Sequence, residues 1–226
     1  MELKLKNDES KWLSQYIIGE KIGEGTYGKV HKALYISKNK EVAIKVIKSN
    51  GEDGIPATTL REIVYMKKLQ GVKYLIEMTD YKISRNKVYM VLEYIPYDLR
   101  EFYKKKVLNS EEIKIIIFKI ISGVNELHKK GIIHRDLKPQ NVLISEDLKI
   151  KITDYGLARN ISLPSRPYTK EILTQNYRPH EIILGSDEYI ESVDIWSVGC
   201  IFVELFLRRP FFDGQTEFEL CFKIFR

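Results

Sequence analysis

The residues with the clearest chemical potential lie in one short segment, from His134 to Asn141. Asp136, Lys138 and Asn141 bring a carboxylate, an ammonium and a carboxamide within six residues, on a stretch that a proline stiffens. Such a carboxylate can orient a hydroxyl nucleophile and accept its proton, and the ammonium can neutralise charge on a moving phosphoryl group. The carboxamide oxygen suits a magnesium ion. The segment therefore indicates phosphoryl transfer, with Asp136 as the base.

A second candidate is the glycine-rich stretch Gly23–Val30, which reads GEGTYGKV. Glycine lets backbone N–H groups approach phosphate oxygens without a side chain in the way. Dinucleotide-binding folds use a similar pattern between a strand and a helix, whereas these glycines lie between two predicted strands. A flexible hairpin that binds nothing is the other interpretation of this stretch taken alone.

Lys45 ends the strand-like run Val42–Lys45, and Glu62 lies on the helix predicted next. An ion pair between them would direct the lysine at the α- and β-phosphates of a nucleotide. Taken singly, Lys45 could face solvent on an edge strand and Glu62 could be a solvated helix charge. Asp154, in Asp154-Tyr155-Gly156, follows Asn141 by 13 residues and would hold magnesium, although aspartate in such a segment is more often a turn residue. The order and spacing of the whole set favour the catalytic interpretation.

The elements that must position these residues change in character along the chain. Strand-like runs cover Tyr16–Glu24, Lys29–Ile36, Glu41–Lys48, Tyr74–Ile83 and Lys87–Tyr94. A helix is predicted over about 58–69, with Leu60, Ile63, Val64 and Met66 on its apolar side. We therefore predict an α+β fold with a leader at 1–15, a small strand-rich lobe with one helix at 16–93, and a mainly helical lobe at 94–226.

The helical part begins most clearly at Asn109, because Asn109 and Glu112 have the spacing of a capping box. Isoleucine, valine and leucine residues then recur at helical spacing, and Gly131 supplies the stop. The apolar positions of this predicted helix are Ile113, Ile116, Ile117, Ile120, Val124 and Leu127.

Composition excludes several classes of protein. The net charge of +6 comes from lysines scattered along the chain, and no nucleic-acid motif accompanies it, so direct nucleic-acid binding is not expected. Cys200 and Cys221 are the only cysteines, which argues against a disulfide framework and favours a reducing, intracellular setting. Charges interrupt the first residues, so a signal peptide is not expected, and the longest apolar run, Ile195–Leu207, is too short to span a bilayer.

Taken together, these residues resemble eukaryotic protein kinases and, more narrowly, the cyclin-dependent kinase family. The narrower resemblance rests on GEGTYGKV at Gly23–Val30, PATTLRE at Pro56–Glu62, LEYIPYDL at Leu92–Leu99, VDIWSVGCIF at Val193–Phe202 and FKIFR at Phe222–Arg226. It implies a bilobal protein-kinase fold and a serine/threonine kinase that uses ATP and Mg²⁺.

The resemblance also implies roles for matching positions. Catalysis would involve Asp136, Lys138, Lys45, Glu62 and Thr174. ATP would be bound by Ile22, Gly23, Glu24, Gly25, Thr26, Tyr27, Gly28, Lys29, Val30, Ala43, Lys45, Leu92, Glu93, Ile95, Asp98, Gln140, Asn141, Leu143 and Asp154. Within that set, the backbone of Glu93 and Ile95 would bond the adenine, Asp98 would reach the ribose, and Asn141 and Asp154 would hold the metal.

Regulation is implied in the same way. Thr169 matches an activating phosphothreonine, which an activating kinase would modify, and three arginines would clamp its phosphate. These arginines are Arg61, Arg135 and Arg159. Thr26 and Tyr27 match a pair whose phosphorylation inhibits relatives, although packing alone could explain them. A cyclin-like subunit would contact Pro56–Glu62, and a protein would be the substrate. The protein would act inside the cell, in the nucleus or the cytoplasm.

Several positions depart from the family pattern. Tyr155 replaces the usual phenylalanine and adds a hydroxyl that needs a partner. The family's Trp-Tyr-Arg-Ala-Pro-Glu appears as Asn176-Tyr177-Arg178-Pro179-His180-Glu181. Relatives continue through further helices beyond the position of Arg226, so we expect part of the surface around Ile195–Leu207 to be exposed. The alternative function is accordingly a catalytically weak or inactive module that binds a cyclin or another partner.

Overall fold

The computed structural model describes residues 2–25, 28–48, 54–84, 86–161, 175–186 and 190–226. The chain forms two compact units, of which the first comprises Met1–Gly71 with Ile76–Ile95 and the second comprises Val72–Leu75 with Pro96–Arg226. The sequence assigned residues 72–75 to the first lobe. They belong to the second unit because Tyr74 O accepts a hydrogen bond from Ile152 N at 2.8 Å and Leu75 forms a parallel bridge with Ile152.

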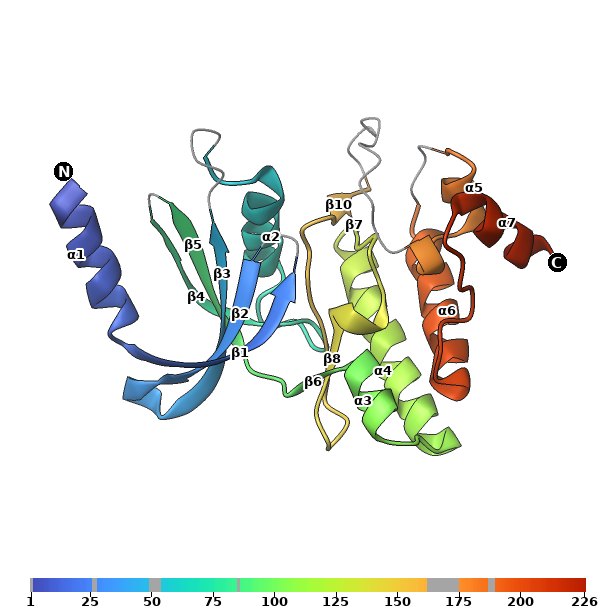
Figure 1. Cartoon of the computed structure of the whole chain (residues 1–226), viewed down its shortest axis with the longest axis horizontal. Helices are drawn as coiled ribbons and strands as arrows, with labels where there is room; N and C mark the ends of the chain where they lie inside the picture. Colours follow the sequence, from blue (N-terminus) through green and yellow to red (C-terminus); the bar gives the residue numbers. More distant parts are fainter. Residues whose placement is uncertain (1, 26–27, 49–53, 85, 162–174, 187–189) are drawn as a thin grey trace. The chain divides into compact units, whose positions relative to one another are not determined.

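The first unit is built on an antiparallel sheet with strand order β1-β2-β3-β5-β4 (Figure 1). Its strands are β1 (Tyr16–Gly25), β2 (Gly28–Tyr35), β3 (Lys40–Lys48), β4 (Met78–Ile83) and β5 (Lys87–Glu93), and its helices are α1 (Glu2–Leu13) and α2 (Ala57–Lys68), with a 3₁₀ turn η1 (Ile36–Lys38). Four predicted strands are confirmed nearly to the residue. The fourth run was predicted too long, because strand pairing begins only at Met78.

Helix α2 is where the sequence predicted, but its buried side is different. Leu60 is 44% exposed and Val64 is 61% exposed, so the prediction that they lie on the packed side was wrong. The buried residues are Thr59, Glu62, Ile63, Tyr65 and Met66. The helix turns Glu62 inward because that carboxylate has an ion-pair partner on β3, and this contact outweighs the apolar periodicity.

The second unit is mainly helical. Its elements are β6 (Tyr97–Asp98), α3 (Leu99–Lys105), α4 (Ser110–Lys129), β7 (Ile132–Ile133), η3 (Pro139–Asn141), β8 (Val142–Ile144), β9 (Ile150–Ile152), β10 (Arg159–Asn160), η4 (Gln175–Tyr177), α5 (His180–Ile183), α6 (Ser192–Leu207) and α7 (Glu217–Phe225). The strands form two small antiparallel sheets, β6-β8-β9 and β10-β7. The α+β class is confirmed, and α1 is a second helix of the sheet unit that the sequence did not predict.

The start of α4 follows the predicted capping box. Asn109 Oδ1 accepts a hydrogen bond from Glu112 N at 2.9 Å, and Asn109 N donates to Glu112 Oε2 at 3.0 Å. The predicted apolar positions Ile113, Ile116, Ile120, Val124 and Leu127 are buried. The helix ends before Gly131, whose φ of +68° lies in the left-handed region that glycine favours.

Helix α6 has two apolar faces with different surroundings. Val198, Ile201 and Leu205 are buried, whereas Ile195, Phe202, Phe206 and Leu207 are 42–53% exposed. Among the residues that the structure describes, no helix combines the length and the apolar character that crossing a bilayer requires.

Candidate active site

In the sheet unit, the glycine-rich stretch joins β1 to β2 by a hairpin. Gly23 pairs with Val30, Glu24 with Lys29, and Gly25 with Gly28. A Cβ added at Gly28 would lie 2.4 Å from Val46 O, so only glycine allows β2 to approach β3 this closely. The predicted positions Thr26 and Tyr27 lie outside the described residues.

The side chains of Glu24 and Lys29 lie on the exposed surface of the hairpin. Lys21 Nζ is 2.6 Å from Glu24 Oε2, and Lys29 Nζ is 3.6 Å from Glu24 Oε1. The two lysines lower the pKa of the Glu24 carboxyl, mainly through the hydrogen bond from Lys21. Because the side chains are about half exposed, solvent screens these pairs and they add little to stability.

Lys45 and Glu62 form an ion pair between β3 and α2. Lys45 Nζ lies 2.6 Å from Glu62 Oε1 and 2.8 Å from Oε2, so both carboxylate oxygens accept from the ammonium. The Glu62 side chain is 4% exposed and that of Lys45 is 16% exposed. Burial makes such a pair costly to break, because the partner left behind would be an uncompensated buried charge. The pair therefore fixes where β3 presents its lysine.

The other predicted nucleotide residues of this unit share a face of the sheet with Lys45. Val30 is directly opposite Lys45, and Ala43, two residues before it, is opposite Leu92. Residues two apart on a strand point to the same face, so Val30, Ala43, Lys45 and Leu92 form one surface. Ile22, by contrast, is 40% exposed next to an irregularity in the β1–β2 register.

Glu93 and Ile95 follow at the end of β5 and are buried. The N–H of Glu93 donates to Glu77 O at 3.0 Å, and its side chain accepts from Glu77 N at 3.1 Å. The main chain and the side chain of Glu93 therefore both hold this segment against Glu77.

In the helical unit, two predicted residues converge on the carboxylate of a third, Asp136. Asp136 Oδ2 accepts from Lys138 Nζ at 2.7 Å and from Asn141 Nδ2 at 2.9 Å. Asn141 Nδ2 also donates to Asp136 O at 2.7 Å. The turn η3, with proline at its first position, places Asn141 back over Asp136. A partly buried carboxylate fixed by a cation and an amide is suited to orient a hydroxyl group.

Three further predicted nucleotide residues lie close by in this unit. Leu143 pairs with Asp98 across β8 and β6. Asp98 is also the N-cap of α3, because its Oδ1 accepts from Glu101 N at 2.7 Å. A ribose hydroxyl would therefore have to bond the other carboxylate oxygen of Asp98. Gln140 Oε1 is buried, and no hydrogen-bond partner for it is found within the described part of the chain. Such an unsatisfied acceptor suits a polar ligand.

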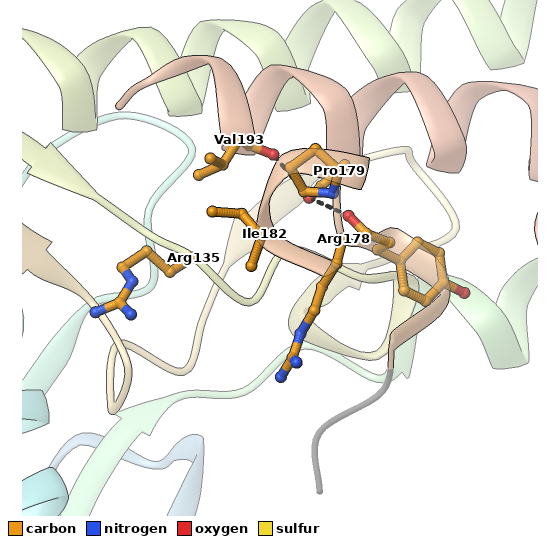
Figure 2. Close-up of a pocket in the computed structure, with 7 residues that line it drawn as sticks. Arg135, Arg178, Pro179, Ile182 and Val193 are labelled. Atoms are coloured by element: carbon orange, nitrogen blue, oxygen red, sulfur yellow. Dashed lines mark hydrogen bonds between the residues drawn. The ribbon is translucent and has the colours of Figure 1, made fainter. Parts of the chain in front are cut away.

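The three arginines of the predicted phosphate clamp are divided between the units. Arg135 and Arg159 belong to the helical unit, and Arg61 lies on α2 of the sheet unit. Arg159 pairs with Ile133 across β10 and β7. Arg135 borders a pocket together with Arg178, which the sequence analysis did not single out (Figure 2). The rest of the lining is Tyr177, Pro179, Ile182, Val193 and Ser197. Thr169 and Thr174, which the sequence assigned to activation and catalysis, lie outside the described residues.

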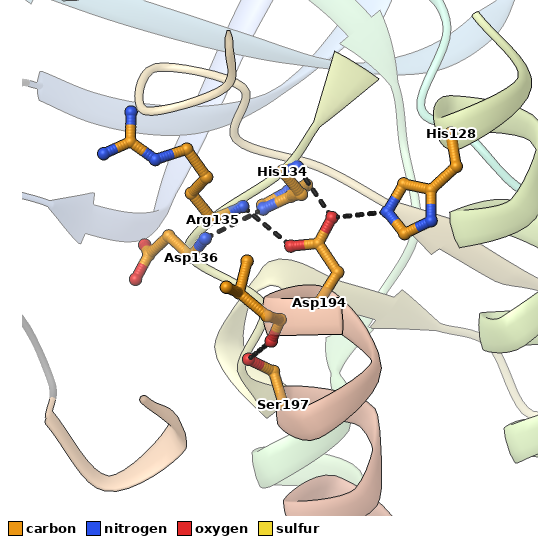
Figure 3. Close-up of polar contacts among 7 residues, drawn as sticks. His128, His134, Arg135, Asp136, Asp194 and Ser197 are labelled. Carbon is orange, nitrogen blue, oxygen red and sulfur yellow. Dashed lines mark hydrogen bonds and ion pairs between the residues drawn. The ribbon is translucent and has the colours of Figure 1, made fainter. Parts of the chain in front are cut away.

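The residue that anchors the catalytic segment was missed by the sequence analysis. Asp194, on α6, is fully buried and accepts hydrogen bonds from His134 N and Arg135 N, each at 2.8 Å (Figure 3). His128 Nε2 lies 2.8 Å from the same carboxylate. Arg135 has a φ of +72°, a left-handed conformation that costs a non-glycine residue about 1–3 kcal/mol. Asp194 stabilises that backbone, and its only signal in the sequence was its place in the VDIWSVGCIF string.

His134 is a structural residue of the segment. It is fully buried, its Nδ1 accepts from Asp136 N at 3.3 Å, and its Nε2 lies 2.9 Å from Thr153 O. Because a carbonyl can only accept, Nε2 must carry the proton. The imidazole thereby joins the segment of Asp136 to the segment that precedes Asp154.

Asp154 and Tyr155 lie in the loop after β9. Asp154 has a φ of +68°, and the preceding Thr153 N donates to Asn141 O at 3.0 Å, which keeps the two predicted metal-binding residues on connected backbone. Tyr155 is fully buried, and its hydroxyl donates to Ile152 O at 2.8 Å. The hydroxyl that tyrosine adds at this position is therefore satisfied by a backbone carbonyl three residues earlier.

Known proteins resemble this chain over most of its length. The protein kinase domain family matches residues 16–226. Cyclin-dependent kinase 2 of Caenorhabditis elegans is 44% identical over 91% of this chain and 57% of its own length. Cyclin-dependent kinase 1 of Encephalitozoon cuniculi is 41% identical over 92% of this chain and 72% of its own length. The chain thus spans little more than half the length of the first of these relatives. The chain belongs to the cyclin-dependent kinase family of protein kinases.

Proposed function

We propose that the chain is a serine/threonine protein kinase that transfers the γ-phosphate of ATP to protein hydroxyl groups. The observation that carries the proposal is the completeness of the catalytic set within each unit. Lys45 is paired with Glu62, and Asp136 is bonded to Lys138 and Asn141. An inactive relative would be expected to lack one of these side chains.

The residues fit ATP and Mg²⁺ by their chemistry. Asn141 Nδ2 is bonded to Asp136, so its Oδ1 is the atom that a metal ion would take, and the Asp154 carboxylate supplies a second hard oxygen. Bound Mg²⁺ would neutralise charge on the phosphates. Lys45, oriented by Glu62, would bind the α- and β-phosphates, and the backbone of the glycine hairpin would cover them.

Asp136 and Lys138 would carry out the transfer step. Both side-chain contacts of Asp136 use Oδ2, which leaves Oδ1 as the oxygen to accept the proton of the attacking serine or threonine hydroxyl. Lys138 would stabilise charge on the transferred phosphoryl group. The family resemblance suggests a substrate serine or threonine followed by proline.

A cyclin-like subunit is the partner we propose, by way of Pro56–Glu62. The cyclin-dependent kinase names of the relatives support it. The exposed Leu60 and Val64 offer an apolar surface on the side of α2 away from Glu62. We further propose that a phosphate on Thr169 is bound by arginines and that the protein acts inside the cell, in the nucleus or the cytoplasm, in cell-cycle or transcription control.

The test is transfer of radioactive γ-phosphate to a peptide containing Ser-Pro or Thr-Pro, with a cyclin present. The control is Asp136→Asn, which keeps the shape of the side chain but removes the base. Transfer by the unchanged chain, with none by Asp136→Asn, supports the proposal. Equal counts from both proteins would overturn it, and nucleotide binding without transfer would favour the alternative of a partner-binding module, which the altered Pro179-His180-Glu181 stretch suggests.

A further inference from the structure

The helix α1 precedes the residues that the kinase domain family matches, yet it packs onto the sheet of the first unit. The helix lies on the opposite side of the sheet from α2 (Figure 1). Trp12 and Leu13 pack against a buried cluster on β1, β2, β3 and β5. The members of this cluster are Tyr16, Ala33, Val42, Ile44, Tyr89 and Val91.

Polar contacts fasten the same segment to the β4–β5 hairpin. Glu9 Oε1 accepts from Tyr89 OH at 2.6 Å, and its other oxygen accepts from the Ser84 hydroxyl. Trp12 Nε1 donates to Asp80 Oδ2 at 2.8 Å. These contacts join residues 68 to 80 positions apart in the sequence and span both strands of the hairpin.

Aromatic contacts fill the space between these polar groups. The ring centroid of Trp12 lies 5.1 Å from that of Tyr16 and 5.8 Å from that of Tyr89. Tyr16 stacks on Tyr35 at 5.0 Å. Rings at these separations attract each other beyond their burial of apolar area. Trp12 is thus the point where the hydrogen bond to β4 and the ring contacts to β1 and β5 meet.

The opposite face of the same strands carries the proposed phosphate-binding lysine. Ile44 and Lys45 are adjacent on β3 and so point to opposite faces. Ile44 is fully buried in the cluster under Trp12, and Lys45 contacts Glu62 of α2. The same alternation separates Val91, in the cluster, from Leu92, which lies opposite Ala43. A displacement of β3 or β5 caused by changes in the cluster next to α1 would therefore also displace Lys45 on the opposite face of the sheet.

We propose that residues 8–16 form a strap that holds β3, β4 and β5 together, and that Trp12 is a positioning residue for Lys45. The strap acts through Ile44 and Tyr89 and does not touch the nucleotide. Its effect on nucleotide affinity rests on the proposed function, whereas its effect on the strands does not.

The experiment compares Trp12→Ala, Trp12→Phe and the matched control Lys11→Ala, whose side chain is exposed on the same helix. Amide hydrogen exchange is measured by mass spectrometry on peptides from β3, β4 and β5, with α4 of the other unit as internal reference. We expect faster exchange in the three strands of Trp12→Ala, an intermediate rate in Trp12→Phe, and unchanged exchange in α4 and in Lys11→Ala.

A second measurement separates positioning from general stability. The Kd for Mg-ATP is measured at a temperature well below the unfolding transition of each variant. We expect Trp12→Ala to weaken binding by about tenfold, because the nucleotide must then order the Lys45 side chain itself, and Trp12→Phe to restore part of the loss.

Two outcomes would overturn the strap. One is unchanged exchange of β3, β4 and β5 in Trp12→Ala, and the other is exchange of residues 8–13 in the unchanged protein as fast as in an unstructured peptide. If the strands respond but the unfolded fraction alone accounts for the change in Kd, the strap stands and the positioning role of Trp12 is refuted. If the unchanged protein does not bind Mg-ATP at all, the proposed function fails, and the exchange data still decide on the strap.

Discussion

The Asp194 carboxylate accepts a hydrogen bond from the backbone N–H of Arg135 at 2.8 Å, although the two residues are 59 positions apart. The bond stabilises Arg135 in its left-handed conformation, one residue before Asp136. A helix residue that does not belong to the catalytic segment therefore determines the path of that segment.

Replacing Asp194 by alanine is expected to destabilise the chain. The change leaves the buried N–H groups of His134 and Arg135 without an acceptor, which costs about 2–4 kcal/mol of unfolding free energy. Urea denaturation followed by circular dichroism measures the loss, and Glu191→Gln, at the exposed start of α6, is the matched control. A midpoint for Asp194→Ala equal to that of the control would show that the carboxylate does not hold the segment.

Breaking the pair between Lys45 and Glu62 is expected to reduce catalysis more than folding. In Glu62→Gln the neutral amide no longer fixes the ammonium, and kcat/KM for ATP should fall by about a hundredfold through misplacement of the lysine. The control is Lys48→Met, which removes an exposed lysine at the end of the same strand and should leave kcat/KM unchanged. Similar kcat/KM values in Glu62→Gln and the unchanged protein would refute a role for the pair.

Alkaline pH is expected to destabilise the chain through buried tyrosines. Burial raises the pKa of Tyr16 to about 12, from an ordinary 10.0, and raises the pKa of Tyr103 and Tyr177 further, with the Glu204 carboxylate adding to the effect in both. The unfolded chain therefore loses these protons first. Stability is present in full below pH 10 and falls as the pH rises from there through the folded-state pKa values.

The measurement is the urea midpoint at intervals between pH 8 and about pH 12. Tyr177→Phe removes one ionisable phenol that donates to Glu204 Oε2 at 2.7 Å. That variant should be less stable near neutral pH and should show a shallower decline above pH 10, the ordinary value for the phenol. A decline as steep as that of the unchanged protein would show that Tyr177 does not contribute to it.

Acid is expected to release the N-terminal strap. Hydrogen bonds from Ser84 and Tyr89 lower the pKa of the Glu9 carboxyl below its ordinary 4.5. A lowered pKa means that the contribution of Glu9 is present above pH 4.5 and is lost as the pH falls through the folded-state value. Exchange of peptides from α1, quenched after labelling at pH 3.5 and at pH 6, measures the release, with labelling times corrected for the intrinsic rate. Glu9→Gln should remove most of the difference, and an undiminished difference would assign it to another acid.

The sequence predicted what depends on local patterns. The β-rich runs and the turn residues between them identified most of β1, β2, β3 and β5, and the capping box located the start of α4. Lys45 and Glu62 were recognised together because their spacing matches a known set. Their roles, like those of the other site residues, stay predictions.

The sequence could not reveal contacts that depend on distant partners. The packed side of α2 was wrong because Glu62 turns inward to an ion pair, which leaves Leu60 and Val64 exposed. The strand expected from Tyr74 begins only at Met78, because Tyr74 and Leu75 bond instead to Ile152. Trp12 and Asp194 were overlooked because neither belongs to a local chemical pattern, and each makes a hydrogen bond to a residue more than 50 positions away.

The short distance between Gly28 and β3 bears on how alanine scanning of the hairpin should be interpreted. An added Cβ at Gly28 would lie 2.4 Å from Val46 O and force the strands apart, so a lower ATP affinity in Gly28→Ala would report strand spacing as well as any phosphate contact. At Gly23 the added Cβ would lie 3.7 Å from Val30 Cβ, an ordinary contact. Gly23→Ala is therefore the substitution that isolates the effect of a side chain on the ligand from the effect of a side chain on the sheet.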